Sequence, residues 1–167
     1  MKLEKSEYAE YYDKYVQLVG ERDPIEVLKD QRTQQFWHEL PPGKDDYRYA
    51  EGKWTPKEVL GHVIDCERIM AYRALSIARG EAIPLPGFDE NLYVENANFG
   101  ERKVESLTME LHFVRASTIM LFAGMNDEIL LKTGIANGNN VSVRALMYII
   151  AGHELHHINI LKERYLR

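Results

Sequence analysis

Apolar residues recur every three to four positions over several long stretches of the chain, and short segments rich in Gly, Pro, Asn and Asp separate these stretches. A repeat of this length is typical of helices that bury one face, because the α-helix turns once in about 3.6 residues. The pattern predicts helices over residues 6–20, 24–40, 56–79, 104–125 and from 143 to the C-terminal end. No stretch alternates apolar and polar residues as a half-buried strand does. Helices joined by loops predict an all-α fold, an antiparallel four-helix bundle.

Local signals mark two of the helix starts most clearly. Thr55-Pro56-Lys57-Glu58 is a capping box with Pro in the first turn, and Ser142 is placed to cap the last helix. Residues 81–103 are predicted to be a long loop with one short helical turn, and long ordered loops are often functional. A second loop, rich in Gly and Asn, is predicted over 134–140. No repeat or flexible linker divides the chain, so residues 1–167 are expected to form one domain.

The composition is that of a globular protein without a strong charge bias. Apolar residues make up 45% and charged residues 28% of the 167 residues, and the net charge is −5. An acidic chain without a basic stripe is not expected to bind nucleic acid, and no apolar run is long enough to cross a membrane. The first residues lack the apolar segment of a secretory signal. The single cysteine, Cys66, excludes an internal disulfide and fits a cytoplasmic protein.

Histidines occupy apolar positions on two of the predicted helices. His153 and His157 lie four residues apart in the apolar stripe of the last helix, so both imidazoles project from one face, about 6 Å apart. His62 lies in the apolar stripe of the helix that starts near Thr55. Three imidazoles facing one bundle core would form a divalent-metal site with open coordination positions, as catalytic zinc sites have.

Each of these residues also has a simpler interpretation. A lone core histidine is more often hydrogen-bonded than metal-bound, whereas two imidazoles at one level of a core are costly to bury without a shared role. Cys66, one turn after His62, could be a fourth ligand, but a small buried hydrophobic residue is the preferred interpretation. Asp65 and Glu58 flank His62 and could fix its tautomer, or be solvated helix charges.

The segment His153-Glu154-Leu155-His156-His157 also spells H-E-x-x-H, the signature of zinc metalloproteases, in which the Glu is the general base. The extended form of that motif needs Gly at position 160 and His at position 163, where this chain has Ile160 and Glu163. No strand pattern precedes the helix to bind a peptide substrate. The motif is therefore weak evidence for a protease, and a third ligand is expected upstream, at His62.

Two features are more specific together than apart: Trp54 and His62 in a W-x₇-H helix start, and the H-x₃-H pair near the end. Further segments accompany them in the order 52–65 (GKWTPKEVLGHVID), 67–69 (ERI), 73–75 (RAL), 85–90 (LPGFDE), 142–146 (SVRAL) and 152–157 (GHELHH). Over most of its length the chain thus resembles the DinB/YfiT-like superfamily of metal-dependent enzymes.

The resemblance implies a four-helix bundle with a left-handed twist, often a homodimer. It also implies that His62, His153 and His157 hold nickel, zinc or a similar divalent ion, and all three positions are filled in this chain. Characterised members use low-molecular-weight thiols as co-substrates, among them bacillithiol and mycothiol S-transferases and a maleylpyruvate isomerase.

The leading functional hypothesis is a metal-dependent S-transferase that joins a small thiol to an electrophile, because a bound divalent ion lowers the pKa of a coordinated thiol. Glu154 or Asp65 could take the proton. Arg115 could anchor a substrate carboxylate or be an ion-paired arginine. Asp89 and Tyr93 in the long loop are candidate pocket-lining residues.

Three other functions stay open at this point. The protein could be a metal-dependent hydrolase of a small ester or amide, which needs no thiol. It could be a stress-response protein that binds a metal or ligand without catalysis, or a structural bundle whose histidines are packed and dry. The tyrosines of the first helix could be core, dimer face or pocket wall; these are Tyr8, Tyr11, Tyr12 and Tyr15.

Overall fold

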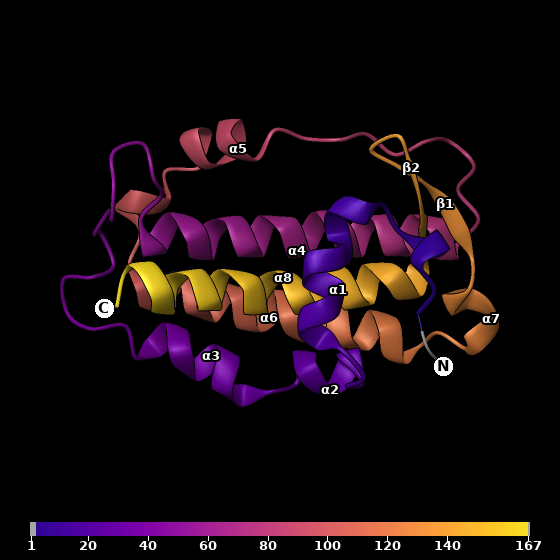
Figure 1. The fold of residues 1–167 in the computed structure, drawn as a ribbon, viewed down its shortest axis with the longest axis horizontal. Helices are drawn as coiled ribbons and strands as arrows, with labels where there is room; N and C mark the ends of the chain where they lie inside the picture. The colour runs from indigo at the N-terminus through magenta and orange to yellow at the C-terminus, as the bar shows by residue number, and fades with distance from the viewer. Residues whose placement is uncertain (1–2, 167) are drawn as a thin grey trace.

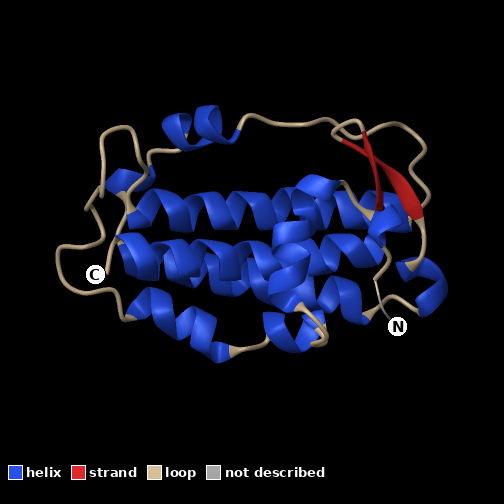
Figure 2. Ribbon diagram, in the orientation of Figure 1, coloured by secondary structure: helices blue, strands red, loops and turns tan. Residues whose placement is uncertain are grey.

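A computed structural model of the chain describes residues 3–166, without the side chains of Gln31 and Gln34. The helices and strands are shown in Figures 1 and 2. They are the 3₁₀ turns η1 (Lys5–Glu7), η2 (Glu10–Tyr12) and η3 (Phe99–Glu101), the helices α1 (Asp13–Val19), α2 (Pro24–Leu28), α3 (Gln31–His38), α4 (Pro56–Ala78), α5 (Glu90–Asn96), α6 (Val104–Ala123), α7 (Asp127–Leu130) and α8 (Val143–Arg164), and the strands β1 (Thr133–Ala136) and β2 (Asn139–Ser142).

The long helices α4, α6 and α8 lie along the long axis of the molecule, and α3 lies along the same axis beside α6 and α8 (Figure 1). Helix α1 crosses this group at a steep angle and packs on α8. The predicted helical bundle is therefore confirmed, and the left-handed twist of the bundle stays a prediction.

The directions of the helices differ in one respect from the predicted antiparallel arrangement. The Tyr165 hydroxyl at the end of α8 donates to the Trp54 carbonyl just before α4, at 2.5 Å, so these two helices are antiparallel. The Lys57 ammonium at the start of α4 donates to the Gly100 carbonyl, which precedes α6, at 2.7 Å. Helices α4 and α6 are therefore parallel. The long connection 79–103 makes this possible, because it carries the chain back along the whole bundle (Figure 1).

The predicted caps are observed. Thr55 Oγ1 accepts from the Glu58 backbone N–H at 3.2 Å, the Glu58 carboxylate accepts from the Thr55 N–H at 2.7 Å, and Ser142 Oγ accepts from the Ala145 N–H at 3.0 Å. The predicted helix over 24–40 is instead divided into α2 and α3. Asp30 causes the break, because its carboxylate accepts from the Arg32 N–H at 3.0 Å and starts a new helix. The first helix begins at Asp13, after the two 3₁₀ turns.

The predicted Gly/Asn-rich loop is a β-hairpin, and this is a correction of the all-α expectation. Asn137 and Gly138 have φ angles of 50° and 73°, the conformation of a type I′ turn, in which glycine is the least strained residue. The hairpin also holds the long connection, because the Leu85 N–H donates to the Ile135 carbonyl at 2.8 Å and the Asn137 N–H donates to the Leu85 carbonyl at 3.0 Å.

The core consists of two apolar clusters along the bundle. One, near the hairpin, includes Val19, Leu28 and Leu146, and the other, near the C-terminal end of α8, includes buried residues such as Trp37 and Leu161. Between the two clusters lie buried charged side chains from α4, α6 and α8, namely Glu67, Arg115 and Glu154. We call these three residues the polar layer. The predicted metal ligands lie on the same stretches of α4 and α8.

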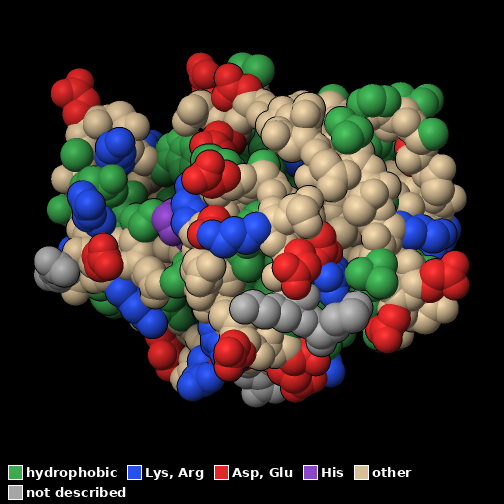
Figure 3. All heavy atoms as spheres, turned by 45° about the vertical axis from the view of Figure 1, so that its right-hand side comes forward, with side chains coloured by type: hydrophobic (Ala, Val, Ile, Leu, Met, Phe, Trp, Pro, Cys, Tyr) green, Lys and Arg blue, Asp and Glu red, His purple; other side chains and the backbone are tan. Residues whose placement is uncertain are grey.

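The surface view shows acidic and basic side chains interspersed, with no large area of one sign on this face (Figure 3). None of the helices within residues 3–166 combines the length and apolar character needed to cross a membrane.

Candidate metal centre

The three predicted histidines meet between α4 and α8. His153 Nε2 lies 3.2 Å from His62 Nε2 and 3.1 Å from His157 Nε2. One ring nitrogen from each residue can be chosen so that all three lie within 4.8 Å of one another. The spacing of four residues on α8 brings two of the rings together, and the antiparallel packing of α4 brings the third.

The arrangement of the nitrogens fits a divalent ion better than it fits hydrogen bonds. A neutral imidazole nitrogen carries either one proton or one lone pair, so His153 Nε2 cannot make a normal bond to both neighbours at once. A tetrahedral ion with bonds of roughly 2.0–2.1 Å holds its ligand atoms about 3.3 Å apart. The two short contacts at His153 are close to that separation.

The histidines are held in the neutral form, which is the form that binds metal. Burial lowers the pKa of His62 to about 4. Burial also lowers the pKa of His153 and of His157 well below the usual value, and the neighbouring histidines lower it further. Near neutral pH the three rings therefore present lone pairs rather than protons.

Aromatic side chains enclose these rings. The Trp54 ring centroid lies 4.8 Å from that of His62, and the Tyr15 ring centroid lies 5.2 Å from that of His153. Tyr15 reaches this position because α1 packs closely on α8: a Cβ atom added at Gly152 would lie 2.0 Å from the Tyr15 carbonyl oxygen. Glycine is therefore required at this crossing.

The position of Cys66 supports the preferred interpretation, a small buried hydrophobic residue. Its sulfur lies 3.6 Å from each ring nitrogen of His62, and the side chain is buried. Burial raises the pKa of the thiol, so the residue is held as a thiol rather than as the thiolate that binds metal.

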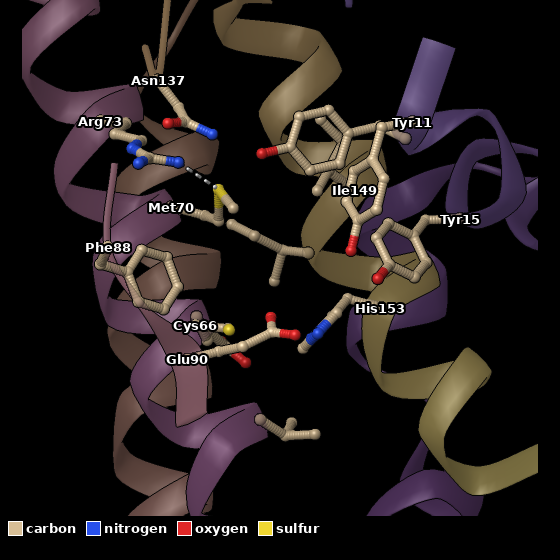
Figure 4. Close-up of a pocket in the computed structure, with 14 residues that line it drawn as sticks. Tyr11, Tyr15, Cys66, Met70, Arg73, Phe88, Glu90, Asn137, Ile149 and His153 are labelled. Atoms are coloured by element: carbon tan, nitrogen blue, oxygen red, sulfur yellow. Dashed lines mark hydrogen bonds between the residues drawn. The ribbon is translucent and has the colours of Figure 1, made fainter. Parts of the chain in front are cut away.

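A cavity of about 160 Å³ opens beside His153 (Figure 4). Cys66, Met70 and Arg73 form its buried part, and Glu90 and Asn137 are exposed at its rim. The Glu90 carboxylate points toward His153 (Figure 4). The remaining lining residues are Tyr11, Tyr12, Tyr15, Val63, Glu67, Phe88, Ile149, Ile150 and His153. Three of the four tyrosines left unassigned by the sequence are therefore pocket wall, and Tyr8 belongs to the apolar core.

Glu154 and Arg115 lie in the polar layer and not in the cavity. Glu154 Oε1 accepts from the Trp37 indole N–H at 3.1 Å, and Oε2 lies 3.0 Å from Arg115 Nη2. The same arginine nitrogen lies 2.8 Å from Glu67 Oε2. Arg115 is thus the ion-paired arginine that the sequence left as an alternative. Because both carboxylate oxygens of Glu154 are engaged, we do not assign it the proton transfer.

Asp65 and Glu58 have partners other than His62. Asp65 is half-buried, 3.8 Å from Arg68 Nη1, and burial raises the pKa of its carboxyl. The Glu58 carboxylate completes the capping box and lies 2.8 Å from Arg48 Nη2. Both carboxylates therefore bind groups at the surface around α4 rather than His62.

Asp89 and Tyr93 flank the cavity without lining it. Asp89 caps α5 by accepting from the Asn91 and Leu92 N–H groups, and the Tyr93 side chain is exposed on α5. Glu90, the residue next to Asp89, is the one that faces the cavity. Sequence reasoning missed Glu90, Arg73 and Asn137, although the first two lie in segments that carried the family resemblance.

Comparisons with known proteins identify the family and a similar fold. The sequence matches the family profile of the DinB superfamily over residues 28–161. The structure is similar to that of YfiT from Bacillus subtilis, described as a probable metal-dependent hydrolase with an unusual four-helix bundle topology. The two chains are 18% identical, with a TM-score of 0.74 over 98% of this chain and 90% of that chain. No curated protein sequence matches this chain. The chain belongs to the DinB superfamily.

Proposed function

We propose that this protein is a metal-dependent enzyme that transfers a small thiol to an electrophile. The observation that carries the proposal is the convergence of three neutral histidine nitrogens beside a cavity with a carboxylate at its rim. Three protein ligands leave coordination positions for a substrate, as in catalytic sites. Imidazole suits nickel and zinc, which we favour as the metal. We place the reaction in the cytoplasm, where small thiols are kept reduced.

A bound divalent ion lowers the pKa of a thiol or water that coordinates it, so that a nucleophile is available near neutral pH. Glu90 is the residue that we assign to take the thiol proton, because its carboxylate points toward His153 and no ion pair within residues 3–166 engages it. The sulfur then forms a bond to the electrophilic carbon, and the leaving group departs with the electron pair of the bond that breaks.

The size of the cavity limits what can be enclosed. A cavity of roughly 150 Å³ holds a molecule such as benzene, and this one measures about 160 Å³. Only the reacting end of a larger thiol fits inside, and the rest must pass the rim between Tyr11, Glu90 and Asn137.

A metal-dependent hydrolase of a small ester or amide is the second candidate. The observation that favours it is the structural similarity to YfiT, which is described as a probable metal-dependent hydrolase. The same histidines and Glu90 serve this reaction with water as the nucleophile. The two candidates differ in one requirement, since the hydrolase turns over without a thiol.

The first test measures metal content and turnover together. We expect about one nickel or zinc ion per chain in wild type, a loss of most of it in His153→Ala, and no change in His38→Ala, whose histidine is exposed on α3. The loaded protein is then assayed with 1-chloro-2,4-dinitrobenzene and a panel of small thiols, and with nitrophenyl esters without thiol.

Turnover that needs both the thiol and His153 supports the transferase. Turnover of esters without thiol supports the hydrolase instead of the transferase. Bound metal without turnover of any electrophile overturns the enzyme proposal in favour of a binding protein, and failure to bind any divalent ion leaves a structural bundle.

A further inference from the structure

Arg73 is a buried cation that faces the cavity. Arg73 is 2% exposed and lies in the last third of α4, about three turns after His62. Nη2 donates to the Pro86 carbonyl at 2.7 Å, and Nη1 contacts the Met70 sulfur at 3.5 Å, which is a weak acceptor. The hydroxyl of Tyr12, which also lines the cavity, is a third hydrogen-bond partner. All three partners are neutral, and none is an anion.

The other strongly buried arginines of residues 3–166 have carboxylate partners. Arg115 is paired with Glu67 and Glu154, and Arg144 is paired with Glu7. No ion pair within 4 Å joins Arg73 to a carboxylate of the described residues. Burying a charge is costly unless an opposite charge accompanies it. The protein thus keeps one buried guanidinium without an anion, and this guanidinium lines the cavity.

The cavity is polar at two separate places. Arg73 and Asn137 lie side by side at one end, while Glu90 and His153 lie at the other (Figure 4). The type I′ turn of the hairpin positions Asn137, because its N–H is bonded to Leu85 and its φ is 50°. A guanidinium next to a side-chain amide is well suited to a carboxylate, which accepts paired hydrogen bonds.

We propose that Arg73, assisted by Asn137, binds a carboxylate of the substrate, and that the thiol substrate is therefore a small mercapto acid. Its sulfur lies at the histidine end of the cavity, and its carboxylate lies at the Arg73 end. This inference names the substrate class of the proposed transferase and rests on that proposal for the role of the sulfur. Arg73 is a binding residue and takes no part in proton transfer.

The test compares two thiols of the same chain length, one ending in a carboxylate and one in an uncharged hydroxyl. Full-length zinc-loaded protein is titrated with 3-mercaptopropionate and with 3-mercapto-1-propanol, and dissociation constants are taken from ¹H–¹⁵N NMR shifts, including the Asn137 side-chain amide. We expect wild type to prefer the acid by at least about tenfold, since hydrogen bonds to a charged group are among the stronger ones. Arg73→Gln should remove the preference and leave the affinity for the alcohol unchanged.

Two further variants keep the result interpretable. Arg79→Gln changes an exposed arginine at the end of the same helix and should retain the full preference. Arg73→Lys keeps the charge without the paired donors, and we expect a reduced preference. It replaces Arg73→Gln if that variant does not give a folded NMR spectrum. Equal affinity of wild type for both thiols, or an unchanged preference in both Arg73 variants, overturns the inference.

A second arm separates this inference from the proposed function. Metal-free protein is titrated with butyrate and with butyramide, which have no sulfur. A butyrate preference that depends on Arg73 supports carboxylate binding even when the loaded protein shows no turnover. Thiol-dependent turnover without any preference for acids supports the proposed transferase and overturns the inference that its substrate is a mercapto acid.

Discussion

Burial of three histidine side chains lowers their pKa values and so determines the chemistry of the candidate metal centre. His62, His153 and His157 lie where α4 and α8 meet, and burial is the largest cause of their lowered pKa values. At neutral pH the three rings therefore keep the lone pairs that can bind a metal. In acidic solution, keeping these rings unprotonated lowers the free energy of unfolding.

This effect gives a pH prediction for the metal-free protein. The pKa of His62 is about 4 in the folded state and 6.5 in the unfolded state, so between these values only the unfolded chain takes up the proton. The free energy of unfolding must therefore decrease as the pH falls from 6.5 to 4, by about 3 kcal/mol for His62 alone. Urea unfolding in the presence of chelator, at pH 7.5, 5.5 and 4.5, measures the change.

His62→Gln is the matched variant, because it removes the titrating group and keeps a polar side chain. Its free energy of unfolding should fall less steeply over the same pH range than that of wild type. Identical pH dependence in the two proteins would contradict the prediction.

For individual residues, the sequence predicted that His62, His153 and His157 lie together, and it missed most of the residues around them. The i, i+4 spacing and the apolar stripes were enough for the histidines. Glu154 lies about 100° from His153 around the helix, and it is 2% exposed because Trp37 and Arg115 engage its carboxylate. The position of Glu90 and the lack of an anion at Arg73 depend on how the long connection folds back, which no local pattern records.

Among the elements, those with strong local signals were predicted best. Helices α4 and α8 begin at their predicted caps, because Thr55 and Ser142 satisfy the first backbone N–H groups locally. The break at Asp30 and the hairpin at Asn137-Gly138 were missed, although Asn-Gly is a strong hairpin signal. The parallel pairing of α4 and α6 could not be derived from helix lengths, because it depends on the path of residues 79–103.

The crossing of α1 and α8 gives a prediction for an element. In Gly152→Ala the new Cβ would meet the Tyr15 backbone, so α1 must shift and Tyr15 must move away from His153. We expect a loss of about 1–3 kcal/mol in the free energy of unfolding and weaker zinc binding. Chemical denaturation and competition with a zinc chelator measure the two effects.

Gly124→Ala is the control, because the nearest atoms to an added Cβ there are 3.7 Å away and the residue has φ of −84°. This variant should keep wild-type stability and zinc affinity. Equal behaviour of the two variants would show that the crossing tolerates a side chain.

The whole molecule presents an apolar face on α6. Met109, Phe113 and Met120 are 60%, 65% and 72% exposed and lie on one side of this helix. A group of exposed large apolar side chains usually marks an interaction surface. We therefore predict that the protein forms a homodimer through this face of α6.

The dimer prediction is tested by sedimentation velocity at micromolar concentrations. Wild type should sediment as a dimer, and Phe113→Glu should shift it toward the monomer, because a charge would be buried in the interface. Ile83→Glu is the control, since Ile83 is 71% exposed outside α6 and should leave the dimer intact. A monomeric wild type, or equal effects of the two substitutions, would contradict the prediction.

The connection between α4 and α6 has a consequence for how the cavity can be altered. It is attached at Leu85 to the hairpin and at Gly100 to the start of α4, and it contributes Phe88 and Glu90 to the cavity. The histidines lie on other elements. New side chains between the two attachment points can therefore alter which molecules enter the cavity, while the three histidines stay in place. In a laboratory evolution experiment, residues 86–98 are the segment in which we would randomise the sequence to obtain new substrate ranges.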